Sequence, residues 1–272
     1  MIISVIKLTV FFLIFSTYIY CIDIEVLPQK VSVGDVFVIK VFKKDDVKLS
    51  IGKSNFPTFL SDDGKFRRVI LGVPSWWDSG NYDIFVDGKN TDVSIEIIKK
   101  EFPTQEIKVA PEKIVENEKT KVQREIISER ILTKTKYKMW EGRFIMPVEG
   151  KITSEFGVRR KVNDKARGYH RGIDISAPLG SIIKASNAGK VVLVGEFILP
   201  GKVVIINHGQ GIVSTYYHLS EILVQEDELV KKGQPIGKVG STGVATGSHL
   251  HWGMYIFGVD VNPLNFVNNI YE

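Results

Sequence analysis

The residues best equipped for chemistry gather near the C-terminal end of the chain. All five histidines of the 272 residues follow residue 169, and they are His170, His208, His218, His249 and His251. Imidazoles exchange protons near neutral pH and are common metal ligands. This clustering predicts a metal-binding or acid–base site in the C-terminal part of the chain.

Two short spacings sharpen that prediction. In the segment 249–251 (His-Leu-His), a strand would point both imidazoles to one face, because side chains at i and i+2 share a face. His170 and Asp174 stand four positions apart, so a curve through Gly172 would bring both to one ion. Imidazole and carboxylate ligands fit zinc, whereas calcium and magnesium prefer more oxygen ligands. The residues predict a zinc site, and the spacing leaves open which histidine of 249–251 binds the ion.

Composition excludes several other kinds of site. The single cysteine, Cys21, rules out an internal disulfide framework and zinc sites built on several cysteines. A net charge of +5 and a pI of about 9.0 favour association with an anionic polymer. No basic stretch interleaved with aromatic residues forms a nucleic-acid motif, so we expect no nucleic-acid partner.

The first 22 residues have the pattern of a targeting segment. After Lys7, the 15-residue apolar run 8–22 matches a secretory signal core and is short for a membrane span. No A-x-A-like step precedes Asp23, which leaves two alternatives open: an uncleaved membrane anchor, or a lipid on Cys21. We expect an exported protein of the periplasm or cell envelope, anchored to the membrane through residues 1–22 if they are not removed.

The pattern along the chain predicts a mainly β protein. Residues 23–100 favour an immunoglobulin-like β-sandwich, with strands at 36–41, 66–70, 82–86 and 93–98. Within it, residues 78–82 (DSGNY) resemble the turn before a tyrosine corner. For Trp76 and Trp77 we expect core or corner packing, with a ligand-stacking platform as the alternative.

A charged linker, residues 101–139, follows the expected sandwich. Thirteen of the 27 residues from 112 to 138 are charged, and Pro111 suits a helix start. The apolar positions at near-helical spacing are Val115, Val122, Ile126 and Ile131 or Leu132. We expect a linker helix with this stripe on a neighbouring domain, a coiled-coil partner being the alternative.

Residues 140–272 return to a β pattern that is rich in glycine. We expect strands at 190–194, 203–206, 214–217, 235–239 and 250–257. No helical pattern separates them, which predicts an antiparallel, barrel-like or sandwich core.

Seven motifs occur in order between residues 144 and 263. They are FIMPV (144–148), SEFGVR (154–159), GYHRGIDI (168–175), YHLS (217–220), GSTG (240–243), GSHLHW (247–252) and VNP (261–263). The combination resembles the lysostaphin-type, or LytM-like, zinc metallopeptidases of peptidoglycan. The resemblance covers nearly half of the chain, and it implies an antiparallel β metallopeptidase domain at 140–272.

The resemblance also implies roles for single residues. His170, Asp174 and His251 would bind one zinc ion, and His218 and His249 would form the catalytic pair. The first of that pair would orient water or stabilise the oxyanion and the second would act as general base, with the roles open to exchange. For His208, which matches another recurring position, we expect a structural role.

The implied function is hydrolysis of peptide crosslinks in peptidoglycan, with its stem peptides as the substrate. Either a D-amino-acid crosslink or a glycine bridge would fit the resemblance. Because every matching position is present, we expect an enzyme; the alternative is a non-catalytic protein that binds peptidoglycan or activates amidases. Residues 228–237 also resemble the hairpin of lipoyl or biotinyl carrier domains, but a carrier would leave the histidines unexplained.

A basic stretch precedes the first expected ligand. Residues 159–171 contain six basic residues and one acidic residue. Such a loop would hold stem-peptide carboxylates through charge-assisted hydrogen bonds, or it would be a solvated surface loop. The two interpretations differ in one measurement, because only the first expects a higher KM when Arg160, Lys165 and Arg167 are neutralised together.

Overall fold

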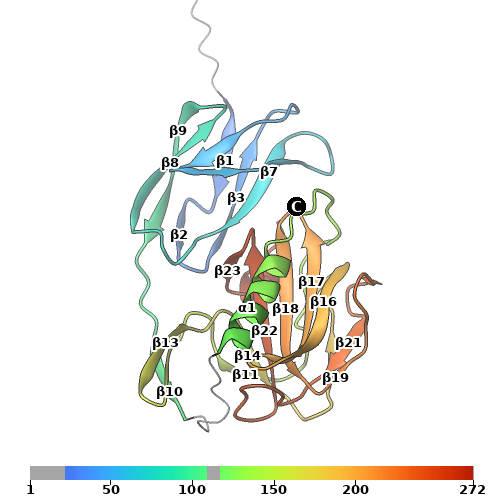
Figure 1. Cartoon of the computed structure of the whole chain (residues 1–272). Helices are drawn as coiled ribbons and strands as arrows, with labels where there is room; N and C mark the ends of the chain where they lie inside the picture. The colour runs from blue at the N-terminus through green and yellow to red at the C-terminus, as the bar shows by residue number, and fades with distance from the viewer. Residues whose placement is uncertain (1–21, 109–116, 272) are drawn as a thin grey trace, which may run out of the picture.

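The computed structural model describes residues 22–108 and 117–271, and Figure 1 shows their arrangement. The mainly β fold predicted from the sequence is confirmed. The expected signal or anchor, with Cys21, lies outside the described residues apart from Ile22, and so do Pro111 and Val115. Among the residues described, no helix has the length and apolar character needed to cross a membrane.

Two sheets form the N-terminal part of the molecule. The first has the order β1 (Ile24–Leu27), β3 (Val36–Val41), β7 (Arg67–Gly72) and β6 (Phe59–Leu60). The second has the order β2 (Lys30–Ser32), β9 (Lys89–Ile98), β8 (Gly80–Val86), β4 (Leu49–Ile51) and β5 (Ser54–Phe56). Phe37, Leu49 and Ile84 are fully buried within one apolar cluster. Four of these strands lie where the sequence pattern expected them, with ends shifted by a few residues.

The turn before β8 treats its two tryptophans differently. Tyr82 donates its hydroxyl proton to the carbonyl of Asp78 at 3.0 Å, the bond expected of a tyrosine corner. Trp77 stacks on Tyr82 with ring centroids 4.8 Å apart, so corner packing is right for Trp77. It is wrong for Trp76, which is 69% exposed. The backbone N–H of Trp77 donates to the Pro74 carbonyl, and in this tight turn only one of the two adjacent indoles packs inward.

The linker contains a strand as well as the expected helix. Strand β10 (Thr104–Ile107) pairs in parallel with β12 (Arg159–Val162), which is antiparallel to β13 (Lys165–Tyr169). Helix α1 (Glu118–Ile131) follows, with Asn117 as its N-cap. The Asn117 side chain accepts the Thr120 N–H and the Thr120 hydroxyl accepts the Asn117 N–H, a reciprocal pair that begins the helix here.

Helix α1 lies against β16 and β17, and of the stripe that the sequence predicted only Ile131 packs inward among the described residues. Val122 and Ile126 are exposed, whereas Ile127 and Ile131 pack with Leu193 and Tyr255. The Gln123 side chain accepts the Ile198 N–H at 2.9 Å. This polar contact, four positions before Ile127, lies on the same inward face as Ile127 and Ile131.

An eight-stranded antiparallel sheet forms the C-terminal part. Its strands in order are β11 (Lys151–Ser154), β14 (Ile173–Ser176), β22 (His249–Ile256), β18 (Ile212–Leu219), β17 (Gly201–Gly209), β16 (Gly189–Phe197) and β20 (Leu229–Val230), with β23 (Val259–Val261) also paired to β22. A smaller sheet has the order β15 (Ile182–Lys184), β21 (Pro235–Lys238) and β19 (Glu221–Ile222), and α2 (Leu264–Asn268) lies near the C-terminus. Trp252, Tyr216 and Phe266 are buried in the core of the C-terminal part.

The two parts of the molecule share apolar contacts. Val36, Val38 and Ile70 of the first sheet belong to the core cluster of the C-terminal part. Gly34 lies against Phe156 so closely that a Cβ there would come within 2.1 Å of the ring, and its φ of 85° already disfavours other residues. Its carbonyl accepts the Asn262 N–H at 2.9 Å. These contacts hold the N-terminal sheets against the sheet that carries the histidines.

Candidate metal centre

Sheet register gathers the candidate residues. In neighbouring strands, Ser154 of β11 stands opposite Asp174 of β14, Asp174 stands opposite His251 of β22, and His251 stands opposite Tyr217 of β18. His170 enters from the loop between β13 and β14. Residues that lie up to about a hundred positions apart in the chain thus meet in one row across the sheet.

His170, Asp174 and His251 converge on a common point. The distances from His170 Nε2 to His251 Nδ1, from His251 Nδ1 to Asp174 Oδ1, and from His170 Nε2 to Asp174 Oδ1 are all 2.9 Å. All three residues are at least nine-tenths buried. They are the group, among the described residues, whose nitrogen and oxygen atoms lie close enough to share one metal ion.

The hydrogen bonds around His170 test whether this group suits a metal. Its Nδ1–H donates to the Glu155 carbonyl at 2.9 Å, so in the neutral ring Nε2 carries a lone pair directed at the cluster. Of the three converging atoms, only His251 Nδ1 then has a proton to donate. Three electron-rich atoms that have one proton between them are better satisfied by a cation, and this donor set fits zinc.

Burial and hydrogen bonding put these groups in the protonation states that metal binding requires. Burial lowers the pKa of His170 to about 4, so the ring is neutral at pH 7. Burial alone would raise the pKa of Asp174, but hydrogen bonds with His170 and His251 outweigh it and hold that pKa well below its usual range. A neutral imidazole and an ionised carboxylate are the forms that bind a metal.

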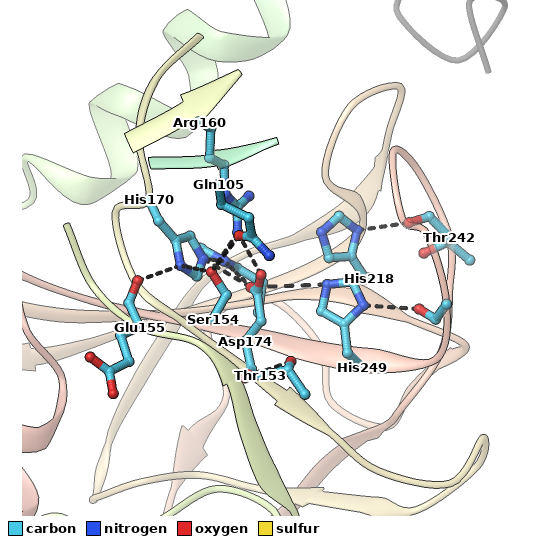
Figure 2. Close-up of polar contacts among 12 residues, drawn as sticks. Gln105, Thr153, Ser154, Glu155, Arg160, His170, Asp174, His218, Thr242 and His249 are labelled. Atoms are coloured by element: carbon cyan, nitrogen blue, oxygen red, sulfur yellow. Dashed lines mark hydrogen bonds and ion pairs between the residues drawn. The ribbon is translucent and has the colours of Figure 1, made fainter. Parts of the chain in front are cut away.

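Two further imidazoles face the same point, as Figure 2 shows. His218 Nδ1–H donates to the Thr242 carbonyl at 2.8 Å, and His249 Nδ1–H donates to the Gly247 carbonyl at 2.9 Å. Their ring centroids are 4.8 Å apart, and His249 Nε2 is 3.9 Å from Asp174 Oδ1. The hydrogen bond from Nδ1 to a backbone carbonyl orients each ring and leaves its Nε2 able to accept a proton.

The backbone at His218 is unusual. Its φ is 66°, a left-handed value that costs a non-glycine residue about 1–3 kcal/mol. In a regular strand Tyr217 and His218 would point to opposite faces, yet Tyr217 stacks on His251 and His218 reaches His249. The positive φ turns the imidazole toward the site. Burial, with the nearby His251 and His249, lowers the pKa of His218 to about 3, so it is neutral at pH 7.

Arg160 and Gln105 also reach this cluster (Figure 2). Arg160 donates to Asp174 Oδ2 at 2.6 Å, on the carboxylate oxygen that does not face His170. The Ser154 hydroxyl, 3.1 Å from His170 Nδ1, donates to Gln105 Oε1 at 3.3 Å. The sequence pointed to Arg160 only as a candidate for binding substrate, because it stands in the basic stretch 159–171. Nothing in the sequence pointed to Gln105 as a neighbour of the site, because it stands in the linker.

We predict that Arg160 positions the carboxylate of Asp174. In Arg160→Gln the carboxylate would lose its charged partner and rotate more freely, so metal affinity should fall about 10- to 100-fold, the usual effect of removing a hydrogen bond to a metal ligand. Titration against a competing chelator measures this. The matched control is Lys165→Gln, an exposed cation in the same hairpin. A raised KM with unchanged metal affinity would instead support binding of substrate carboxylates by Arg160.

His208 lies away from the cluster, in the core beside Phe144. Its Nδ1–H donates to the Ala188 carbonyl at 2.7 Å and its Nε2 accepts the Ser214 hydroxyl at 2.8 Å. Both ring nitrogens are therefore used inside the fold, which agrees with the structural role expected for this histidine. Burial lowers the pKa of His208 to about 4.

His208 should make stability depend on pH. Its pKa is about 6.5 when unfolded and about 4 when folded, so between these values the unfolded chain binds more protons. The contribution of the neutral His208 ring to the free energy of unfolding is complete above pH 6.5. This contribution should decline as the pH falls toward 4, by up to about 3 kcal/mol. Urea unfolding with a chelator present, from pH 7 to pH 4.5, should show a flatter profile for His208→Gln than for the unchanged chain. Parallel profiles would contradict this.

The antiparallel sheet, its His-Asp-His cluster and the two oriented imidazoles have the composition of a metal-dependent hydrolase centre. Residues 168–263 match the model of peptidase family M23. The predicted resemblance to lysostaphin-type metallopeptidases is thereby confirmed. The sequence is similar to peptidoglycan DD-endopeptidase ShyA of Vibrio cholerae, with 38% identity over 121 residues that make up 43% of this chain and 28% of that protein.

Other similar proteins extend the comparison. The murein hydrolase activator NlpD of Escherichia coli is 36% identical over 122 residues, 44% of this chain and 30% of that protein. The chain thus spans less than a third of the length of these two relatives. A solved structure of a putative M23 peptidase from Pseudomonas aeruginosa covers 87% of this chain and 94% of its own, with a TM-score of 0.69 and 26% identity. That similarity reaches beyond residues 168–263 into the N-terminal part.

Proposed function

We propose that this protein is an exported zinc metalloendopeptidase that hydrolyses peptide crosslinks of peptidoglycan. The observation that carries the proposal is the complete set of five side chains around one point: His170, Asp174 and His251 as ligands of one zinc ion, with His218 and His249 beside them. Similarity to a peptidoglycan DD-endopeptidase supports this substrate class. The expected signal segment supports export, with retention in the cell envelope if it remains as an anchor.

The chain's own residues would divide the reaction between them. Bound zinc would lower the pKa of a coordinated water to about 7 and polarise the scissile carbonyl. His249 Nε2 would accept the proton of the attacking water and return it to the leaving amine. His218 Nε2 would accept a hydrogen bond from the attacking water and orient it, and the ring would stabilise the developing oxyanion only after taking up a proton there. The Thr242 and Gly247 carbonyls would hold both rings in the tautomer that these steps need.

Release of muropeptides from purified sacculi tests the proposal. The full chain is the appropriate protein, because the core of the C-terminal part includes Val36, Val38 and Ile70 of the N-terminal sheet. Chelator-sensitive loss of crosslinked dimers, followed by mass spectrometry, would support the enzyme and identify the bond that is cut. A zinc-loaded chain that binds sacculi and releases nothing would contradict it.

A second candidate function is activation of amidases without catalysis by this chain. The similarity to the murein hydrolase activator NlpD favours it. This function predicts that added amidase releases more stem peptide from sacculi when the chain is present, and that His249→Ala changes nothing. Loss of the effect in His249→Ala would argue against it.

A further inference from the structure

A groove lies between the N-terminal sheets and the end of β22 that is remote from the metal centre. One part, of about 330 Å³, has aromatic and proline walls formed by Phe56, Pro74, Trp76, Trp77 and Phe257. The other part, of about 420 Å³, is bordered by the basic residues Arg67, Lys134 and Lys136. Pro57, Lys134 and Phe257 line both parts, so the two adjoin. Volumes of this size suit ligands of a few rings.

Trp76 gives the aromatic part its exposed apolar surface. The indole is 69% exposed, and its neighbour Trp77 is fixed by stacking on Tyr82. The bond from Tyr82 to the Asp78 carbonyl closes the same turn. A large exposed aromatic side chain on a rigid turn, beside a groove, is a feature of ligand-binding surfaces.

The charge of the groove is positive. Lys134 and Lys136 are exposed and make no ion pair with any part of the chain that the structure describes. The acidic residue of the groove, Asp46, is paired with Arg67. Two uncompensated ammonium groups beside an aromatic wall favour a ligand that carries both apolar ring faces and carboxylates.

The position of the groove limits the kind of ligand that could use it together with the metal centre. His251 and Phe257 are six residues apart along β22 and its end, which at 3.4 Å per residue is about 20 Å. A crosslink peptide held at the metal centre would reach the groove only if about six of its residues ran fully extended along that path. A polymer could occupy both places.

We propose that this groove binds the glycan strand of peptidoglycan, with a sugar ring stacked on Trp76. Lys134 and Lys136 pair with carboxylates attached to that strand, which are those of the stem peptides or the lactyl carboxylates that remain after an amidase removes the peptides. This inference rests on the proposed function, because that function makes the polymer the substrate. Sugar rings present apolar C–H faces to indoles, and the exposed Ser54 and Asn55 at the rim offer hydrogen bonds to hydroxyl groups. A proline-rich peptide without acidic residues would also stack on Trp76 but would leave the two lysines without partners.

Co-sedimentation tests the groove independently of hydrolysis. The full chain carrying His249→Ala is mixed with purified sacculi, and separately with glycan strands from which an amidase has removed the stem peptides. Adding Trp76→Ala should weaken binding to both about tenfold, the equivalent of one stacked ring. Adding Lys134→Gln and Lys136→Gln together should weaken binding and reduce its dependence on salt. The controls are Leu229→Ala, exposed to 71%, and the pair Lys53→Gln and Lys89→Gln.

Two results would overturn the inference. Unchanged binding in Trp76→Ala would show that the groove is not the contact. Binding that depends on Trp76 with sacculi but is lost with stripped glycan strands would show that the occupant is the stem peptide. If Trp76-dependent glycan binding holds while the unchanged chain releases no muropeptides, the groove assignment stands and the proposed enzymatic function fails.

Discussion

Asp174→Asn and His170→Ala should each abolish metal binding and peptide hydrolysis together. Asp174 Oδ1 and His170 Nε2 are two of the three converging atoms and lie 2.9 Å apart. Asp174→Asn removes the negative charge of one ligand, and His170→Ala removes the nitrogen lone pair of the other. Hydrolysis should fall more than the roughly 100- to 10,000-fold that loss of a general base produces, because the activated water itself is lost. Zinc content after dialysis and release of soluble muropeptides are the two measurements.

Asp164→Asn is the matched control for the first variant. Asp164 lies in the turn between β12 and β13, and its exposed carboxylate pairs only with Lys108 among the described residues. This change should preserve zinc content and hydrolysis. A thermal unfolding midpoint close to that of the unchanged chain would show that Asp174→Asn and His170→Ala remain folded. Full zinc content in either variant would mean that the ligand assignment is wrong.

His249→Ala and His218→Ala should retain zinc and lose hydrolysis. Neither imidazole provides one of the three converging atoms, but each ring directs its Nε2 toward them. Removing the proton acceptor should lower kcat about 100- to 10,000-fold, equivalent to roughly 3 to 5 kcal/mol. The same zinc and hydrolysis assays separate this pattern from the previous one.

The outcome for His249 also decides a question that spacing left open. If His249→Ala loses zinc while His251→Ala keeps it, the two histidines of 249–251 have exchanged roles. Full hydrolysis in His218→Ala would remove this residue from the mechanism and would leave the strain at its φ of 66° without a catalytic reason. His208→Gln is the comparison for a histidine outside the site, and it should keep zinc at neutral pH.

Sequence reasoning identified the strands well because their signals are local. Alternating β-branched residues and Gly-Asp or Asp-Gly turns predicted the strands now seen at β3, β8 and β9. The linker helix was found, but of its inward face only Ile131 was predicted, because Val122 and Ile126 are exposed. Charge and period alone could not show that Gln123 would bond to Ile198, a contact made with a segment 75 residues away. The strand β10 was missed because it exists only through pairing with β12.

The sequence by itself determined the chemistry available to this protein. Five histidines confined to one region, two short spacings and seven ordered motifs indicated a zinc peptidase centre, because residue type and close spacing are properties of the chain itself. Only the tertiary structure brought Asp174 opposite His251, turned His218 into the site and joined Arg160 to the carboxylate. It also left Trp76 exposed beside Lys134 and Lys136. The physical reason is that sheet register and packing between distant segments depend on many weak contacts at once, and no single stretch of sequence encodes them.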